Sequence, residues 1–297
     1  MLRTKLLTLS AVTAAAALSL TACAPSSSQG GGGDAAGSSS AGESTSSGSG
    51  ESLRIGIKFD QPGLGYREGS AQPTGFDTDV ARYVADKLGV AEKDIEWVQT
   101  PSANRENALE NGEVDMIFAT YSITDARKER VDFAGPYFVA GQDLLVRADD
   151  TEITGPDALD GKNLCSVTGS TSAQKIKDQF ASGVNLVEQG GYAECVTYLE
   201  SGQVDAVTTD DIILAGLAAA DANKGKFKVV GNTFTTERYG VGLPKDSERC
   251  EDINEAIKEM KDSGEWKKAL ESNTEGTGYT YDETLNSGED AEFEPCA

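Results

Sequence analysis

The sequence predicts an α/β fold made of two lobes, each built around its own sheet. Short apolar runs typical of buried strands alternate with amphipathic stretches of helical length, a pattern that indicates parallel sheets with helical crossovers. The second observation is an internal repeat. LENGEVD begins at Leu109 and LESGQVD begins at Leu199, and five of the seven positions are identical. Two lobes of similar topology explain this repeat better than a coincidence of helix and strand boundaries.

The first half supplies one set of alternating elements. In chain order we expect a strand at 53–58, a helix at 75–89, a strand at 95–99, a helix at 104–112 and a strand at 114–119. Gly89 and Gly112 are expected to end the two helices, because glycine readily adopts the left-handed conformation of a C-terminal cap. A further helix is expected to begin within TYSITDAR, residues 120–127.

The second half repeats the pattern. Its expected elements are a strand at 163–167, a helix at 171–182, a strand at 184–189, a helix at 192–202, a strand at 206–210 and a helix at 211–220. Ligands of open α/β sheets collect beyond the carboxyl ends of the strands. Thr120 and Asp210 have the same separation as the two copies of the repeat. We therefore expect them at equivalent strand ends that face each other.

The N-terminus predicts export. Two basic residues precede an apolar run from Leu6 to Leu20, and small residues lead to Cys23, which is typical of a signal peptide. LTAC resembles the lipobox of bacterial lipoproteins, so we expect residues 1–22 to be removed and Cys23 to be lipidated. The alternative is an ordinary signal peptide with a chance cysteine. Residues 23–52 then form a Gly/Ser-rich linker with a reach of roughly 30 Å.

Composition excludes several classes of function. The formal net charge is −23, which argues against binding nucleic acid or anionic lipid. The chain has no histidine, which excludes Ser-His-Asp triads and HExxH zinc sites. We expect no metal and no cofactor. Besides Cys23 there are four cysteines, at 165, 195, 250 and 296. An even number in an exported chain predicts two disulfides, with three pairings open.

TYSITDAR concentrates hydrogen-bond donors at a strand end. Its hydroxyls, a helix start and Arg127 are suited to an anion. Asp210, on the facing lobe, supplies a carboxylate. Donors opposite a carboxylate suit a zwitterion, so we expect an amino acid held by its carboxylate at Arg127 and its ammonium at Asp210. The alternative role for Asp210 is to cap the following helix, a position for which Asp211 competes.

Longer stretches carry a family resemblance. These are GFDTDVARYVADKLG, NRENALENGEVDMIFATYSITDARKERVDFAGPYF, TGSTS and YGVGLPK. From Leu53 to about Asn273 the chain resembles the polar-amino-acid substrate-binding lipoproteins of ABC importers, the family 3 solute-binding proteins. IGIKFDQPGLG with the N-terminal lipobox is most similar to the glutamate-binding lipoproteins. The resemblance implies a type 2 periplasmic-binding-protein fold, in which two α/β lobes joined by two hinge strands close on one amino acid.

The resemblance also implies roles for individual residues. Arg127 matches the arginine that grips the α-carboxylate, Ser122 a hydroxyl on the same group, and Asp210 the ammonium-binding aspartate. Thr120 matches a group near the ammonium. Gly169, Ser170 and Thr171 match a helix start that binds the carboxylate, although both hydroxyls could simply cap that helix.

Specificity for the ligand side chain rests on a second group. Arg105 matches an arginine that binds the distal carboxylate in some relatives, with pairing to Glu106 or Glu113 as the alternative. Lys58 and Ser102 are further candidates. Tyr192 matches a side-chain-binding position. Two cations near the side-chain end would favour glutamate or aspartate over glutamine.

The implied organisation selects boundaries and disulfides. We expect residues 53–146 and 238–297 to form the first lobe and 147–237 to form the second. Pairs Cys165–Cys195 and Cys250–Cys296 are predicted, because either alternative pairing would tie the inserted lobe to segments beyond the hinge and oppose opening.

The sequence therefore predicts a monomeric, membrane-tethered, extracytoplasmic binding protein. It would deliver glutamate to the permease subunits of an ABC importer, without covalent chemistry. The alternatives are the same role for glutamine, aspartate or asparagine, a cyclic-amino-acid dehydratase on the same fold, or a sensor lobe of a signalling protein.

Overall fold

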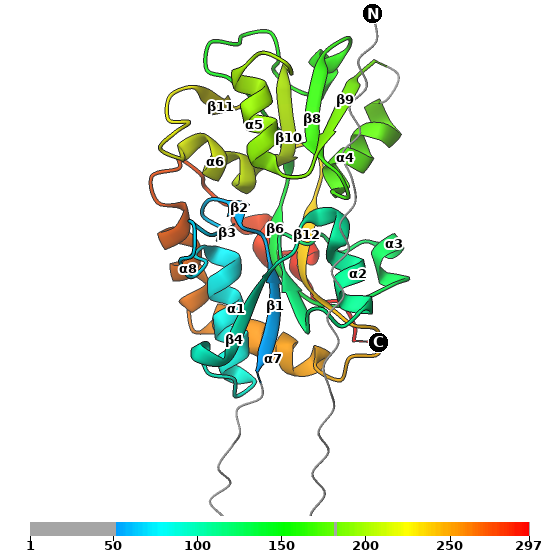
Figure 1. Ribbon diagram of the computed structural model, residues 1–297, viewed down its shortest axis with the longest axis vertical. Helices are drawn as coiled ribbons and strands as arrows, with labels where there is room; N and C mark the ends of the chain where they lie inside the picture. Colours follow the sequence, from blue (N-terminus) through cyan, green and yellow to red (C-terminus); the bar gives the residue numbers. More distant parts are fainter. Residues whose placement is uncertain (1–51, 181–182, 297) are drawn as a thin grey trace, which may run out of the picture. The chain divides into compact units, whose positions relative to one another are not determined.

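The computed structural model describes residues 52–180 and 183–296 and contains two five-stranded sheets (Figure 1). The predicted signal peptide, Cys23 and nearly all of the linker lie outside the described residues. The strands are β1 Leu53–Ile57, β2 Asp60–Gln61, β3 Gly65–Tyr66, β4 Ile95–Gln99, β5 Met116–Phe118, β6 Asp132–Ala140, β7 Gln142–Arg147, β8 Asn163–Val167, β9 Asn185–Gln189, β10 Ala206–Asp210, β11 Phe227–Val229 and β12 Glu237–Leu243.

Helices connect the strands and cover the sheets. They are α1 Phe76–Lys87, α2 Arg105–Glu110, α3 Asp125–Lys128, α4 Thr171–Lys175, α5 Tyr192–Glu200, α6 Asp211–Ala219, α7 Cys250–Asp262, α8 Glu265–Thr274 and α9 Glu283–Ser287. Short 3₁₀ turns lie at Glu92–Asp94, Ser102–Asn104, Pro156–Leu159 and Glu289–Ala291. Directly after α4 comes a π-helical stretch, Ile176–Phe180, where the sequence predicts a continuous α-helix.

The two sheets define two lobes. The first lobe contains the sheet β4-β1-β5-β12-β6 with its helices, and the second contains β11-β7-β10-β8-β9 with its helices. The pairs β1–β4, β1–β5, β8–β9 and β8–β10 are parallel, as crossover connections require, whereas β12 and β7 run antiparallel to their neighbours.

The chain crosses between the sheets twice. It leaves the first sheet at Ala140 and enters the second at Gln142, and it returns from β11 to Glu237. The crossings touch, since Phe234 N–H donates to the Gln142 carbonyl at 3.0 Å. The lobe boundaries predicted from the sequence stay a prediction, and the sheets favour placing the first of them near Gly141 instead of after residue 146.

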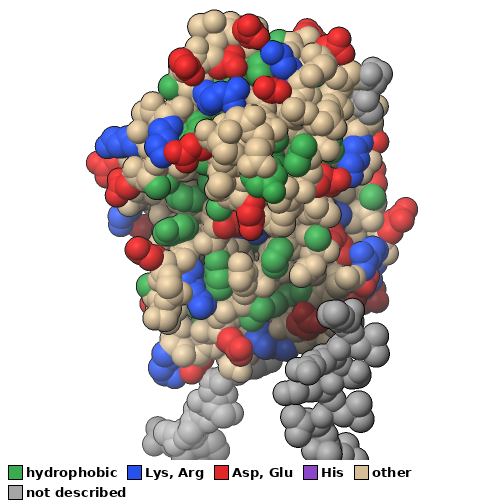
Figure 2. Space-filling view, turned by 45° about the horizontal axis from the view of Figure 1, so that its top comes forward, with side chains coloured by type: hydrophobic (Ala, Val, Ile, Leu, Met, Phe, Trp, Pro, Cys, Tyr) green, Lys and Arg blue, Asp and Glu red, His purple; other side chains and the backbone are tan. Residues whose placement is uncertain are grey.

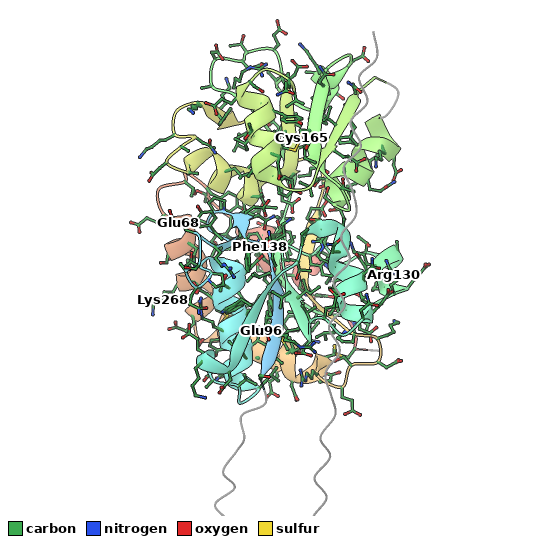
Figure 3. All side chains as sticks on the ribbon, in the orientation of Figure 1. Glu68, Glu96, Arg130, Phe138, Cys165 and Lys268 are labelled. Carbon is green, nitrogen blue, oxygen red and sulfur yellow. A yellow bond between two sulfur atoms is a disulfide. The ribbon has the colours of Figure 1, made fainter. Side chains whose placement is uncertain are left out.

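The first sheet has an apolar core on each face because its strands alternate. Leu53, Ile55 and Phe118 pack on one face under α1, α7 and α8. Ile117 points the other way into a smaller cluster under α2. Phe138, on β6, joins the larger cluster (Figure 3). Burial on both faces is typical of parallel sheets.

The second sheet is buried in the same way. Val167 and Val207 pack under α5 and α6, while Leu164 and Ala206 face the opposite cluster. The helix–glycine–strand units of the repeat occur in both lobes. Gly112 has a φ of 64° and Gly202 a φ of 76°, so each ends its helix in the left-handed conformation.

Each lobe contains one disulfide that cross-links its own segments. Cys165–Cys195 joins β8 to α5 within the second lobe, and Cys250–Cys296 joins the start of α7 to the C-terminal segment. This is the pairing that the sequence predicts. The space-filling view shows Lys and Arg side chains interspersed with Asp and Glu on the face it displays (Figure 2). None of the helices in the described ranges is both long enough and apolar enough to cross a bilayer.

Candidate functional site

The candidate site is a small cavity where the ends of β5 and β10 face each other. Ten residues line it: Ser102, Arg105, Thr120, Ser170, Thr171, Ser172, Tyr192, Thr209, Asp210 and Ile213. Seven of these are residues that the sequence predicts for ligand binding. Thr120 comes from the first lobe and Asp210 from the second, as the repeat predicts.

Thr120 is held in an unusual backbone conformation. Its φ is 44°, in the left-handed region that β-branched residues seldom adopt. The Asp77 carboxylate accepts its N–H at 2.9 Å and the Tyr137 hydroxyl at 2.8 Å, which fixes this turn. Burial raises the pKa of Asp77 to about 6, although both hydrogen bonds act against the rise. Asp77 therefore holds Thr120 in position without lining the cavity itself.

Asp210 is a buried carboxylate with one unused oxygen. It occupies the N-cap position of α6, but its side chain makes no cap bond. Oδ2 accepts the Tyr239 hydroxyl at 2.5 Å, and Oδ1 has no hydrogen-bond partner among the described residues. Burial and the nearby Glu237 raise the pKa of Asp210 well above its usual value. At the same helix start, Asp211 donates its N–H to the Gly141 carbonyl, and its carboxylate accepts the N–H groups of Gly141 and Ile212. Asp211 and not Asp210 therefore bonds the backbone there, which disfavours the capping alternative for Asp210.

Arg105 is a buried guanidinium that lies against the same cavity. Its side chain is 2% exposed, and its NH groups donate to the carbonyls of Ala119 and Gly169 at 3.0 and 3.3 Å. These partners are carbonyl oxygens and not carboxylates, and Arg105 Nε has no partner in the described part of the chain. Glu106, its alternative partner from the sequence, pairs with Arg127 at 3.3 Å.

Arg127 lies beside the cavity and does not line it in this structure. Its guanidinium donates to the carbonyls of Ser122 and Gly169 at 2.6 and 3.0 Å. Burial and the neighbouring Arg105 lower the pKa of Arg127 to about 10. Both guanidiniums lie over the Tyr121 ring, with centroid distances of 4.2 and 4.8 Å. The Gly169 carbonyl thus receives two cationic donors, a position that suits an anionic acceptor.

Hydroxyl groups connect the two lobes at the same edge. Ser122 Oγ lies 3.3 Å from Thr171 Oγ1, and Thr171 donates to Glu237 at 2.9 Å. Ser170 caps α4 by accepting the Ala173 N–H at 3.0 Å, the role that the sequence gives as its alternative. Glu237 begins β12 and also pairs with Lys175.

Lys58 lies next to the cavity at the side-chain end. It is 2% exposed, and its ammonium lies 3.4 Å from Ser102 Oγ and 5.5 Å from the centroid of the Tyr192 ring. Burial lowers the pKa of Lys58, and the neighbouring Asp60 opposes this. Lys58 lines an adjoining pocket of about 300 Å³ together with Asp60 and Glu194.

The cavity is smaller than an amino acid. Its free volume is about 10 Å³, close to what one water molecule requires. Ligand entry therefore requires the lobes to separate, which breaks the bonds from Arg105 and Arg127 to the Gly169 carbonyl. Relative motion of two lobes about two crossings is an established way to open such a site.

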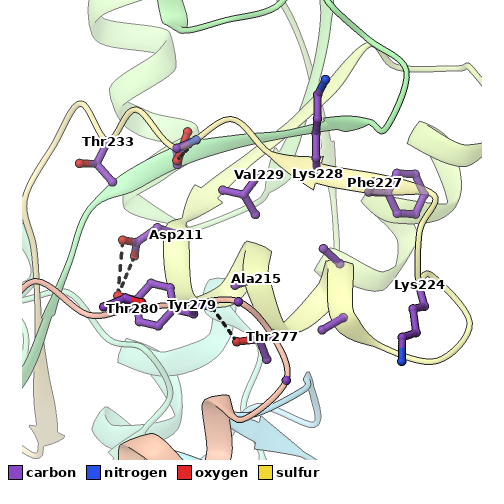
Figure 4. A pocket seen from close by; sticks show the side chains of 16 residues that line it. Asp211, Ala215, Lys224, Phe227, Lys228, Val229, Thr233, Thr277, Tyr279 and Thr280 are labelled. Atoms are coloured by element: carbon purple, nitrogen blue, oxygen red, sulfur yellow. Dashed lines mark hydrogen bonds between the residues drawn. The ribbon is translucent and has the colours of Figure 1, made fainter.

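A larger cavity, of about 510 Å³, lies on another side of α6 (Figure 4). It is bounded by β11, α6 and the segment 276–280, and Tyr279 donates to Asp211 there at 3.4 Å. The carboxylates of Asp143 and Asp211 at its wall already accept backbone N–H groups. Among the described residues, none that lines this cavity has a buried polar side-chain atom without a hydrogen-bond partner, whereas the smaller cavity has three such atoms, so the smaller one is the stronger candidate. Residues 52–180 and 183–296 contain no cluster of metal-ligating side chains.

Sequence reasoning missed several polar residues of the site. Thr209 lines the cavity, while Asp77, Tyr239 and Glu237 act through Thr120, Asp210 and Thr171. Thr209 directly precedes Asp210, and the same position at a strand end could have identified it. Tyr239 and Glu237 lie on the returning crossing, far along the chain. Tyr239 begins the YGVGLPK stretch, to which sequence reasoning gave no role in the site, and no local pattern marks Glu237.

Comparisons with known proteins agree with this geometry. The model for bacterial extracellular solute-binding proteins, family 3, matches residues 53–274. A glutamate-binding protein, GluB, of Corynebacterium efficiens is 48% identical over 233 residues, covering 75% of this chain and 78% of the relative. The ABC transporter glutamine-binding protein GlnH of Bacillus subtilis is 37% identical, covering 73% and 78%. An ancestral arginine-binding protein bound to glutamine aligns with a TM-score of 0.69 and 36% identity, covering 75% and 97%.

Proposed function

Because this chain belongs to the bacterial extracellular solute-binding proteins of family 3, we propose that it captures free glutamate and delivers it to the permease of an ABC importer. It acts outside the cytoplasm as a binding protein and not as an enzyme. One observation supports the choice of ligand most directly. The unpartnered Arg105 Nε and the unpartnered Asp210 Oδ1 both belong to one cavity between the lobes, as far as the described residues go.

These two groups are complementary to an amino acid. A buried carboxylate oxygen without a donor is costly, and an ammonium group would satisfy it. A buried guanidinium with only carbonyl acceptors would likewise gain from a carboxylate. In this proposal the α-ammonium binds Asp210, and the α-carboxylate binds Arg127 with Ser122 and Thr171.

The ligand side chain extends toward Arg105 and Lys58 in this arrangement. A second carboxylate would meet two buried cations there, whereas the amide of glutamine would offer them only a neutral oxygen. The relatives named for glutamate and for glutamine make glutamine the nearest competitor. The charge of the site favours glutamate.

Titration calorimetry of the purified chain with glutamate, glutamine, aspartate and asparagine tests the proposal. We expect the lowest dissociation constant for glutamate. Arg127→Ala should weaken binding by roughly two to three and a half powers of ten, because breaking a buried ion pair costs about 3–5 kcal/mol. Lys128→Ala is the matched control, since Lys128 pairs at the surface with Asp125 and Glu294. Tighter binding of glutamine would overturn the choice of glutamate.

We also propose that a lipid on Cys23 holds the protein at the outer face of the membrane. The lipobox and the polar linker support this. Cys23→Ala should move the protein from the membrane fraction to the medium, and continued sedimentation with membranes would contradict it. A monomer is proposed as the binding unit, because the described lobes form the whole cavity from a single chain.

A further inference from the structure

Asp60 links the two lobes at the edge of the candidate site. It lies on β2 of the first lobe, and its Oδ2 accepts the N–H of Tyr192 on the second lobe at 2.9 Å. Tyr192 is the first residue of α5, so its N–H is one of those that the helix itself leaves without a partner. The carboxylate of one lobe therefore completes the helix start of the other.

The other oxygen of Asp60 is engaged within its own lobe. Oδ1 lies 3.7 Å from the ammonium of Lys58, a side chain that is 2% exposed. This buried cation holds the carboxylate on one side while Oδ2 is directed at the second lobe. Preorganised, charge-assisted hydrogen bonds are stronger than neutral ones.

Gly191 makes the contact possible. A Cβ at position 191 would lie 2.6 Å from Asp60 Oδ2 and 2.8 Å from Glu194 Oε2. The backbone at Gly191 is extended, with a φ of −148°, so alanine fits the conformation, and its Cβ displaces the carboxylate ends of Asp60 and Glu194. A Cβ at position 190 would meet no heavy atom of the described residues within 4 Å, so Gly190 provides a matched control.

We propose that Asp60 is a positioning residue that latches the lobes closed over the ligand. This rests on the proposed function in one respect: the ligand lies in the cavity beside the latch. Release of the ligand requires the lobes to separate, so the latch acts on dissociation. Asp60 touches neither Arg127 nor Asp210, but it pairs with Lys58. Gly191→Ala leaves that pair in place, so its effect should be the same for glutamate and glutamine.

Kinetics of glutamate binding to the full chain test the latch. Asp60→Ala and Gly191→Ala should each raise the dissociation rate about tenfold or more, and neither should lower the association rate, because ligand entry also requires the lobes to separate. The double variant should be no worse than either single one, since both remove the same contact. Gly190→Ala should match wild type. Independent, additive losses in the double variant would overturn the latch.

Hydrogen exchange of the Tyr192 amide, measured without ligand, separates this from the proposed function. The amide should lose protection in Asp60→Ala and in Gly191→Ala, whichever amino acid the protein binds. Equal exchange in wild type and Asp60→Ala would refute the latch even if glutamate binding is confirmed. Loss of protection in a chain that binds no amino acid would refute the proposed function alone.

Discussion

Asp210→Asn should nearly abolish glutamate binding and at the same time stabilise the ligand-free protein. The substitution keeps the shape of the side chain and an oxygen for the Tyr239 hydroxyl, which now lies 2.5 Å from Oδ2. It removes the charge that the ligand ammonium would meet. Breaking a buried ion pair costs about 3–5 kcal/mol, so the dissociation constant should rise by roughly two to three and a half powers of ten.

The gain in stability follows from the raised pKa of Asp210. Burial and Glu237 disfavour the ionised carboxylate in the folded chain, so at pH 7.5, where the unfolded chain is ionised at this position, the carboxyl lowers the free energy of unfolding. The gain from asparagine should shrink as the pH falls, because the folded wild-type chain binds the proton more readily than the unfolded chain and is favoured by the fall in pH. Thermal unfolding of the ligand-free protein at pH 7.5 and pH 5 measures both effects.

Asp211→Asn is the control for binding. Asp211 is the next residue, and its carboxylate accepts the Ile212 N–H at 2.7 Å without lining the cavity. Its glutamate affinity should stay within about threefold of wild type, a loss of under roughly 1 kcal/mol. If Asp210→Asn also binds within that limit, or if it unfolds at a lower temperature than wild type at pH 7.5, the reasoning about Asp210 is wrong.

Three further predictions concern specificity and stability. Arg105→Ala should reduce the preference for glutamate over glutamine by roughly five- to tenfold in calorimetry, and equal losses for both ligands would show that Arg105 only shapes the pocket. The pKa of Asp77 is about 6 in the folded chain against 3.8 ordinarily, so wild type should gain up to about 3 kcal/mol in unfolding free energy over Asp77→Asn between pH 7 and pH 4. Chemical denaturation measures this, and Asp86→Asn, an exposed change on the same helix, should show no such trend. Replacing Cys165 and Cys195 by serine opens a loop with a sequence separation of 30 and should lower the unfolding free energy by about 3–4 kcal/mol, and an unchanged denaturation midpoint would contradict this.

Local patterns were sufficient to predict the lobes and the two strand ends. The repeat placed Thr120 and Asp210 at equivalent positions because helix, glycine and strand follow each other within a few residues in both lobes. The period of the apolar residues determines which strand faces are buried, and burial determines where the strands end. These are short-range properties, and a single sequence displays them directly.

Pairing across the lobes could not be predicted in this way. Arg105 and Glu106 are adjacent in sequence, and local reasoning gave an ion pair between them as one alternative. In the structure the Glu106 carboxylate pairs with Arg127, and the Arg105 guanidinium turns toward Gly169 of the opposite lobe. Whether a buried charge is satisfied depends on residues brought together by tertiary packing, which sequence spacing does not encode.

The same limit explains why the proposed latch contact was invisible to sequence reasoning, although Tyr192 itself was named as a side-chain-binding position, while most of the proposed binding residues were not. Lys58, Thr120 and Asp210 lie at or just after strand ends, and the strand pattern marks those places. Asp60 and Tyr192 are separated by 132 residues and meet only because both lobes are folded and in contact. Gly191 is the sequence feature next to this contact, and in the sequence it resembles any glycine at a helix start. Its role is visible only from the structure, where a Cβ at this position would lie 2.6 Å from Asp60 Oδ2. Gly191 and the adjacent Gly190 look alike in the sequence, yet only the Cβ position of Gly191 is approached by the facing lobe, so the distinction between them comes from the tertiary structure alone.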